Sequence, residues 1–301
     1  MDRFKLPLKE SYLDNGAESP IFKVYHSDGP YMHFHKLNVL SWKIVSIDEN
    51  SIPINLHHGD MHYNPVTIAH YGLELYSLIM RGDKSEILLE KFSNVVKWCL
   101  ENQSDDGGWP FSFDHLFFKD RVASLNKNWY SGLSQGMMIS VLTRARTLLN
   151  IDVSSSINRS LDVILKPVEL GGVRRIFYDK YDFYEEYPTT PASFVLNGFI
   201  FCLIGIYDGW QLNKDDRFFN AYKSGVNSLS HMLPFYDLGL GSSYDLTHLT
   251  SLVEGPNRAR HSYHRLHIQL LSTINSIEGG VFDRVVNRWD SYLKGNELIT
   301  N

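Results

Sequence analysis

From about residue 63 onward, apolar residues recur at three- and four-residue spacing in one segment after another. This period gives an α-helix one apolar face, whereas a half-buried strand alternates every second residue. The spacing predicts helices near residues 65–80, 84–102, 131–149, 155–166, 190–207, 215–232, 260–275 and 279–293. A chain of 301 residues with this pattern has room for one large domain or two of ordinary size.

Helix ends are marked by capping residues and by breakers. Asn64-Pro65 and Thr190-Pro191 each combine a capping residue with proline at the first helical position, which predicts a helix start at both places. The run Asp105 to Pro110 predicts a firm stop.

The first 55 residues differ from the rest. Aromatic and β-branched residues at 31–34 and 38–48, with a turn signal at 28–30, indicate short strands or an extended arm. We therefore expect an N-terminal arm over residues 1–55 and a helical domain over residues 56–301. Repeated helix pairs joined by loops with Gly, Trp and Pro indicate a mainly α fold, an α/α toroid ((α/α)6-barrel-like), with another bundle topology as the alternative.

The most apolar stretch covers residues 192–207. It is shorter than the roughly 20 residues of a membrane span and contains Asn197 and two glycines, so we expect a helix buried among other helices. Cys99 and Cys202 lie in apolar helical patterns, which indicates reduced, packed thiols and no disulfide.

Charge and motifs exclude several classes of protein. The net charge of −5 gives no global basic field, which argues against nucleic acid or an anionic membrane as partner. Met1 to Lys5 include no apolar signal region, so we expect a cytoplasmic protein without a membrane span. Phosphate-loop, dinucleotide and nucleophile-elbow motifs are missing, so we expect no cofactor. We also consider a homodimer.

Polar and aromatic residues gather in three clusters. Residues 181–191 place three carboxylates and three phenols directly before the buried helix, at a position that favours a site, with a solvated acidic loop as the alternative. Residues 241–248 and 256–267 add tyrosines, arginines and histidines. Aromatic residues make up 13% of the chain, which suits either a cleft for sugar rings or an aromatic core.

Histidines recur in two places. His57, His58 and His62 surround Asp60, and His261, His264 and His267 follow one another every three residues. Neither group matches a specific metal-ligand motif. We therefore expect no metal, and consider hydrogen-bonded histidines or a cationic lining for an anionic ligand.

Several strings resemble the C-terminal catalytic region of D-glucuronyl C5-epimerases. They are YNPVTIAHYGL (63–73), GGWP (107–110), WYSGLSQGMMIS (129–140), EEYPTTPASFVLNGF (185–199), LIGIYD (203–208) and PNRARHSYH (256–264). Together these matches span roughly residues 63 to 294.

The resemblance implies an α/α toroid that inverts C5 of glucuronic acid in a heparosan-type polymer, giving iduronic acid. It also implies that Glu186, Tyr187, Tyr244 and Tyr263 form the active site. The family has an arginine three residues after the tyrosine of its YDL motif, where this chain has Thr247, so the usual partner of the carboxylate is either missing or replaced by Arg265 or His248.

The chemistry of this reaction agrees with these residue types. C5 inversion needs acid/base groups on both faces of the sugar, and the carboxylate of the substrate needs a cation or a hydrogen-bond donor. The residues that we expect to bind the substrate are Tyr63, Asn64, Trp129, Tyr130, Gln135, Glu185, Asn197, His248, Arg258, Arg260, His264 and Arg265. Basic residues that could form the walls of an anionic-polymer groove are Lys119, Arg121, Lys127, Arg174 and Arg175.

Three other functions fit the same residues. A uronate polysaccharide lyase begins with the same C5 deprotonation. An inverting glycosidase would use Glu185 or Glu186 as one of its two carboxyls. A non-catalytic glycan-binding protein would keep the groove without the chemistry.

Overall fold

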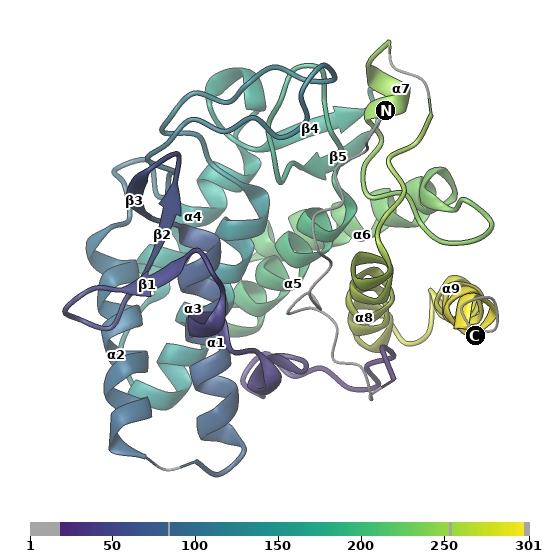
Figure 1. Cartoon of the computed structure of the whole chain (residues 1–301). Coiled ribbons are helices and arrows are strands. Elements are labelled where there is room, and N and C mark those ends of the chain that lie inside the picture. The colour runs from purple at the N-terminus through teal and green to yellow at the C-terminus, as the bar shows by residue number, and fades with distance from the viewer. Residues whose placement is uncertain (1–18, 84, 253–254, 298–301) are drawn as a thin grey trace.

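The computed structural model describes residues 19–83, 85–252 and 255–297, and these are mainly helical (Figure 1). The α-helices are α1 (Pro65–Met80), α2 (Glu86–Glu101), α3 (Gly132–Leu149), α4 (Ser154–Leu165), α5 (Leu196–Asn213), α6 (Asp216–Tyr236), α7 (Thr247–Thr250), α8 (His261–Ile277) and α9 (Asp283–Glu297). Short 3-10 helices cover Phe34–Lys36, Val39–Ser41 and Val168–Leu170. The predicted start of α1 is confirmed, because the Asn64 side chain accepts hydrogen bonds from the backbone N–H groups of Val66 and Thr67.

Two small antiparallel sheets accompany the helices. Strands β1 (Val45–Ile47), β2 (Pro53–His57) and β3 (Asp60–Tyr63) form one sheet in that order, and β4 (Arg174–Phe177) pairs with β5 (Tyr181–Tyr184) in the other. In Figure 1 both sheets lie toward the upper part of the molecule, with long loops around them, and most of the helical layer lies below. The long loops and strand ends therefore gather at one end of the helices.

Helices α3 and α5 pack closely against each other at the centre of the fold. A Cβ atom on Gly205 would overlap the backbone of Gly136, and one on Gly136 would lie 2.5 Å from the Cα atom of Cys202. Only glycine permits this approach of two backbones. Helices α1, α2 and α4 pack around α3, while α6 and α8 pack on α5.

The apolar stretch that the sequence singles out is indeed interior. Residues Leu196 to Ile206 of α5 are buried on every side, and Cys99 and Cys202 are buried free thiols, as predicted. No helix within the described part of the chain is both long and apolar enough to cross a membrane.

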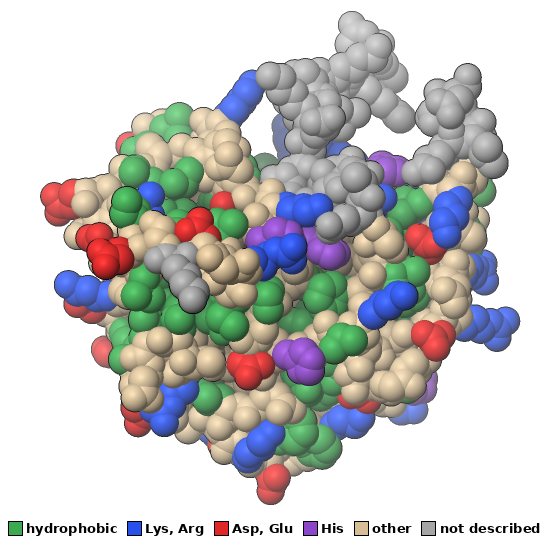
Figure 2. Space-filling view, turned by 90° about the horizontal axis from the view of Figure 1, so that it is seen from below, with side chains coloured by type: hydrophobic (Ala, Val, Ile, Leu, Met, Phe, Trp, Pro, Cys, Tyr) green, Lys and Arg blue, Asp and Glu red, His purple; other side chains and the backbone are tan. Residues whose placement is uncertain are grey.

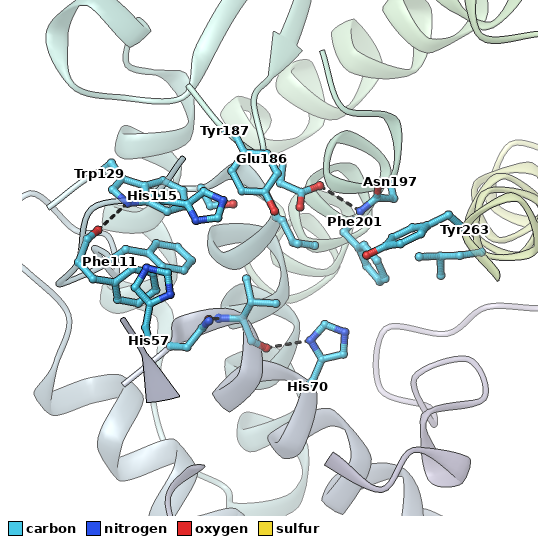
Figure 3. Close-up of a pocket in the computed structure, with 16 residues that line it drawn as sticks. His57, His70, Phe111, His115, Trp129, Glu186, Tyr187, Asn197, Phe201 and Tyr263 are labelled. Carbon is cyan, nitrogen blue, oxygen red and sulfur yellow. Dashed lines mark hydrogen bonds between the residues drawn. The ribbon is translucent and has the colours of Figure 1, made fainter. Parts of the chain in front are cut away.

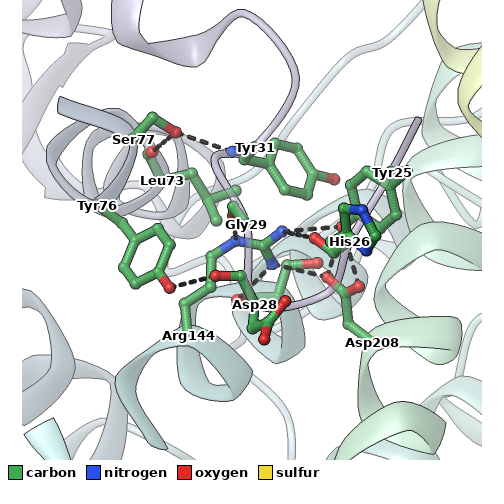
Figure 4. A network of polar contacts seen from close by, with 11 residues as sticks. Tyr25, His26, Asp28, Gly29, Tyr31, Leu73, Tyr76, Ser77, Arg144 and Asp208 are labelled. Atoms are coloured by element: carbon green, nitrogen blue, oxygen red, sulfur yellow. Dashed lines mark hydrogen bonds and ion pairs between the residues drawn. The ribbon is translucent and has the colours of Figure 1, made fainter. Parts of the chain in front are cut away.

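A buried ion pair joins the two central helices to the N-terminal arm (Figure 4). Arg144 of α3 donates from Nη1 to Oδ2 of Asp208 on α5 over 2.8 Å, and both side chains are fully buried. The hydroxyl of Tyr25 donates to the same carboxylate, and Nε of Arg144 donates to the carbonyl of Gly29. These bonds fasten residues 25–31 to the helical core.

The predicted helix start at Thr190-Pro191 is wrong, because α5 begins only at Leu196. The backbone N–H of Phe194 donates to Oε2 of Glu185, and that of Leu196 donates to the carbonyl of Tyr244. These donors are satisfied by neighbouring segments and are not available for a further helical turn.

The N-terminal segments also differ from prediction. Residues 34–36 and 39–41 form 3-10 turns, and β2 and β3 were not predicted. The hairpin of β4 and β5 was missed because Tyr178 and Asp179 make its turn at positive φ without glycine. Strands β1, β2 and β3 form one sheet that includes residue 55. The division of the chain into an arm and a helical domain at that residue stays a prediction.

We predict that Asp208→Ala lowers the free energy of unfolding by about 3–5 kcal/mol, because it leaves the Arg144 guanidinium buried without its counter-ion. The matched control is Asp162→Ala, which breaks a half-exposed pair with Arg217 and should cost less than about 1 kcal/mol. Chemical denaturation of both variants measures the difference. Equal losses would contradict the assignment of the Arg144–Asp208 pair as a central tie.

Candidate active site

A pocket of about 200 Å³ opens at the end of the helices where the long loops gather (Figure 3). The segment before α5, the first turns of α1, α3 and α8, the end of β2 and the loop between α2 and α3 all contribute to it. The lining residues are His57, Asn64, Val66, His70, Phe111, Phe113, His115, Trp129, Ser131, Leu133, Glu186, Tyr187, Asn197, Phe201, Tyr263 and Leu266.

One wall of the pocket is a row of stacked rings. Phe111 stacks on Trp129 with ring centroids 4.0 Å apart, and His115 stacks on Trp129 at 5.7 Å. His115 and Phe117 also stack on Tyr187, at 5.1 and 4.4 Å. Because aromatic contact fixes ring planes, the row holds the phenol of Tyr187 in one orientation.

The three predicted tyrosines come together. The rings of Tyr244 and Tyr263 meet edge to face with centroids 4.8 Å apart, and Phe117 lies between Tyr187 and Tyr244, at 6.2 Å from the latter. Figure 3 shows the hydroxyls of Tyr187 and Tyr263 pointing toward the middle of the pocket from different segments. The pocket therefore presents phenols from two sides.

Glu186 is buried between these phenols. Nδ2 of Asn197 donates to its Oε2 over 3.0 Å, and Gly198 leaves room for the carboxyl, since a Cβ there would overlap it. Burial raises the pKa of Glu186 to about 8, against the lowering effect of hydrogen bonds from Tyr187, Asn197 and the Gly198 backbone. Glu186 therefore holds its proton at neutral pH.

Glu185 and Glu186 are adjacent in sequence, but their side chains have different partners. Its Oε2 accepts hydrogen bonds from the hydroxyl of Ser193 and the N–H of Phe194, and Oε1 lies 3.4 Å from Nε of Arg175. Burial raises its pKa to about 7, although Arg175 and the N–H donors lower it. Glu185 is not among the described lining residues, and it ties β5 to the segment that leads into α5.

Two buried histidines fix the segment of Tyr244. The Trp289 carbonyl can only accept, so His264 donates to it from Nε2, and burial lowers the pKa of His264 to about 4. A neutral His264 accepts at Nδ1 from the hydroxyl of Ser242, which in turn accepts from Nδ1 of His267. Ser242 stands two residues before Tyr244, whose ring stacks on His267.

Arg121 reaches the same region from the loop between α2 and α3. Its Nη1 donates to Oγ1 of Thr247 over 3.0 Å, and its guanidinium lies 4.4 Å above the ring of Phe118. Thr247 donates in turn to Oδ1 of Asp245. Thr247, three residues after Tyr244, thus holds the guanidinium of Arg121, which comes from a distant part of the chain.

The structure places the remaining predicted site residues in different surroundings. Asn64, Trp129 and Asn197 line the pocket. Gln135, Tyr130 and His264 are buried and bonded elsewhere, Gln135 to the backbone of Trp109 and Tyr130 to Ser104. Tyr63 lies outside the described lining and donates to Asp48. The half-buried His248 and Arg265 and the exposed Arg258 and Arg260 also lie outside that lining.

The sequence did not lead us to predict the row of stacked rings that forms one wall of the pocket. Phe111, Phe113 and His115 alternate with polar residues, and this period of two is the signal that marks a strand-like edge. Isolated bridges pair Phe111 with Trp129 and His115 with Leu125, so the alternation does place all three side chains on the pocket side.

Charge on the surface is mixed. On the described part of the face in Figure 2, basic and acidic side chains are interspersed. No group of three or more His, Cys, Asp or Glu side chains that could hold a metal ion occurs among the described residues.

Comparison with known proteins gives consistent matches. The family model of the D-glucuronyl C5-epimerase C-terminus matches residues 103–291. A D-glucuronyl C5-epimerase of Caenorhabditis elegans is 38% identical over 258 residues, which cover 78% of this chain and 41% of that protein. An uncharacterized protein of Methanocaldococcus jannaschii is 28% identical over 187 residues, covering 60% of this chain and 56% of that protein.

The chain therefore spans less than three fifths of the length of either relative. The matched family range contains Glu186, Tyr187 and Tyr263, which line one pocket, and Tyr244, whose ring contacts that of Tyr263. On these matches, the chain belongs to the D-glucuronyl C5-epimerase family.

Proposed function

We propose that this chain inverts C5 of D-glucuronic acid residues in a heparosan-like polymer and converts them to L-iduronic acid. The observation that carries the proposal is the pair of phenols, Tyr187 and Tyr263, that enter one pocket from separate segments beside the buried carboxyl of Glu186. Membership of the epimerase family supports it.

Inversion removes the proton from C5 and returns one to the opposite face. The two faces need separate acid/base groups within hydrogen-bond reach, and Tyr187 and Tyr263 supply them. One phenol acts as its phenolate and takes the proton, and the other donates its own. Tyr244 contacts the ring of Tyr263 and completes the group of phenols.

Glu186 has the protonation state that the intermediate requires. Loss of the C5 proton spreads negative charge onto the carboxylate of the substrate, so a second carboxylate close by would oppose the reaction. Since burial holds Glu186 neutral at pH 7, its O–H donates a hydrogen bond to that developing charge.

Arg121 supplies the cation for the same carboxylate. Its guanidinium donates to the hydroxyl of Thr247 and to the carbonyl of Gly255, which are both uncharged, so its positive charge is left for an anionic substrate.

The arrangement of the helices supports an α/α toroid. Consecutive helices lie against each other in the pairs α1 with α2, α3 with α4, α5 with α6 and α8 with α9. We infer that these hairpins form the ring, with the polymer bound across the end where the long loops gather.

We expect Tyr187→Phe to lower the C5 exchange rate by about a hundredfold to ten-thousandfold, because it removes one acid/base group and keeps the ring stack. Exchange is measured as deuterium at C5 of heparosan in deuterated water. The control is Tyr181→Phe in the same segment, which should retain the wild-type rate. A wild-type product that absorbs in the ultraviolet would identify a lyase instead.

The turnover number should fall as pH rises through about 8, because Glu186 then loses the proton that it donates. The sign follows from the raised pKa: the neutral form is present below about 8 and disappears above it. Glu186→Gln keeps a donor and cannot ionise, so its profile should lack this alkaline fall. A rate that rises through pH 8 in the wild type but not in Glu186→Gln would show that the ionised form of Glu186 is required.

Arg121→Gln should lower kcat/KM for heparosan by about tenfold to a hundredfold, since it removes a charge-assisted bond to the substrate. Arg146→Gln, on the exposed last turn of α3, is the matched control and should stay within about twofold. Equal kinetics for the two variants would remove Arg121 from the site.

A further inference from the structure

Four histidines gather on one side of the pocket, and we name His57, His58, His62 and His115 the histidine cluster. The ring centroid of His57 lies 4.3 Å from that of His58, 6.3 Å from that of His62 and 6.2 Å from that of His115. His57 and His115 line the pocket, and His115 also stacks on Tyr187. The cluster therefore begins at the reaction site and continues outward along the β2–β3 hairpin.

Hydrogen bonds fix two of these rings. Nε2 of His57 donates to the carbonyl of Asp114 over 3.0 Å, and Nδ1 of His62 lies 3.0 Å from the hydroxyl of Ser112. Each ring keeps its second nitrogen for another partner. The ring centroid of Phe113 lies 4.1 Å from that of His57 and 5.1 Å from that of His62, so Phe113 packs against both imidazoles.

The cluster is also where the pocket can carry positive charge. The described lining residues include no lysine or arginine, and their basic side chains are His57, His70 and His115. His70 lies deep, with Nδ1 bonded to the carbonyl of Val66 and its pKa lowered to about 4 by burial. Apart from Arg121, which stands outside this lining beside Thr247, a ligand with a carboxylate in every acidic sugar would therefore meet its cationic partners at the cluster.

Few other charged groups face the cluster. Asp60 lies opposite His57 in the hairpin register and is exposed. The carboxylate of Asp114 accepts the backbone N–H of Lys127, whose side chain is exposed. Across the pocket stand Glu186, which is neutral at pH 7, and the Tyr187 phenol. Positive charge that develops on the cluster is therefore offset only by two aspartates at its rim, among the described residues.

We infer that the histidine cluster is a second subsite, which binds the carboxylate of a neighbouring uronic acid in the same polymer chain and binds it more tightly as the imidazoles gain protons below neutral pH. This inference rests on the proposed function, because it takes the substrate to be a uronic acid polymer.

Proton uptake and ligand binding are coupled at such a site. Histidine is the ordinary side chain that changes charge between pH 5 and 8. Rings 4 to 6 Å apart repel one another when several are protonated, and a carboxylate placed among them relieves that repulsion. The half-buried His115, with its pKa lowered to about 4 by partial burial and by His57 and His58, would gain most from an added anion. By linkage, affinity for the anion must then rise as pH falls.

The test is the affinity for heparosan, measured by calorimetry at pH 7.5 and pH 5.5 at one ionic strength. The wild type should bind about tenfold more tightly at pH 5.5. The double variant His58→Asn with His62→Gln should show a rise of about twofold or less. Asn suits the positive φ of His58. The single variant His58→Asn, on the exposed turn, should show a rise in affinity between those of the wild type and the double variant. It provides the test if the double variant fails to fold.

The matched control is His231→Gln, an exposed histidine on α6 that should keep the full pH response. A double variant with the wild-type pH response would overturn the inference, as would an equal rise for heparosan whose carboxyls have been reduced to alcohols. C5 exchange is followed in parallel with the wild type. Absence of exchange contradicts the proposed function, whereas exchange with an unchanged binding response contradicts the subsite alone.

Discussion

The close packing of α3 on α5 is the constraint on which the rest of this structure depends. Gly136 and Gly205 let the two backbones touch, and the buried pair of Arg144 with Asp208 joins the same helices further along. An unpaired charge at that depth would be costly, so the pairing also fixes which face of each helix points inward. The remaining helices pack outside this pair.

The starts of the same two helices also hold the segment that carries Glu186 and Tyr187. Gly132 opens α3, and a Cβ there would lie 2.9 Å from the carbonyl oxygens of Tyr184 and Glu185, while Gly198 near the start of α5 makes room for Glu186. The segment that carries Glu186 and Tyr187 therefore packs closely against glycines near the starts of both helices.

Two adjacent glutamates differ because the groups that surround their carboxyls differ. Glu185 turns to Arg175, Ser193 and Phe194 and serves as a structural anchor. Glu186 turns to Asn197 inside the pocket, where burial without a cation keeps it protonated. Their neighbours, and not their residue type, separate an anchor from the proton donor that we propose. The role that we infer for the histidine cluster extends this logic, because two of its partly buried rings line the same pocket.

The sequence by itself determined the helices, since a period of 3.6 residues and a cap such as Asn64 reflect local chemistry. The family motifs pointed to Glu186, Tyr187, Tyr244 and Tyr263 as the expected site residues. Only the tertiary structure decided the start of α5, because Glu185 and Tyr244 take hydrogen bonds that a further helical turn would need. It also decided that Arg121 meets Thr247 and that His57 meets His115. Such partners lie tens to more than a hundred residues apart, and no local pattern encodes a contact that arises when distant segments pack.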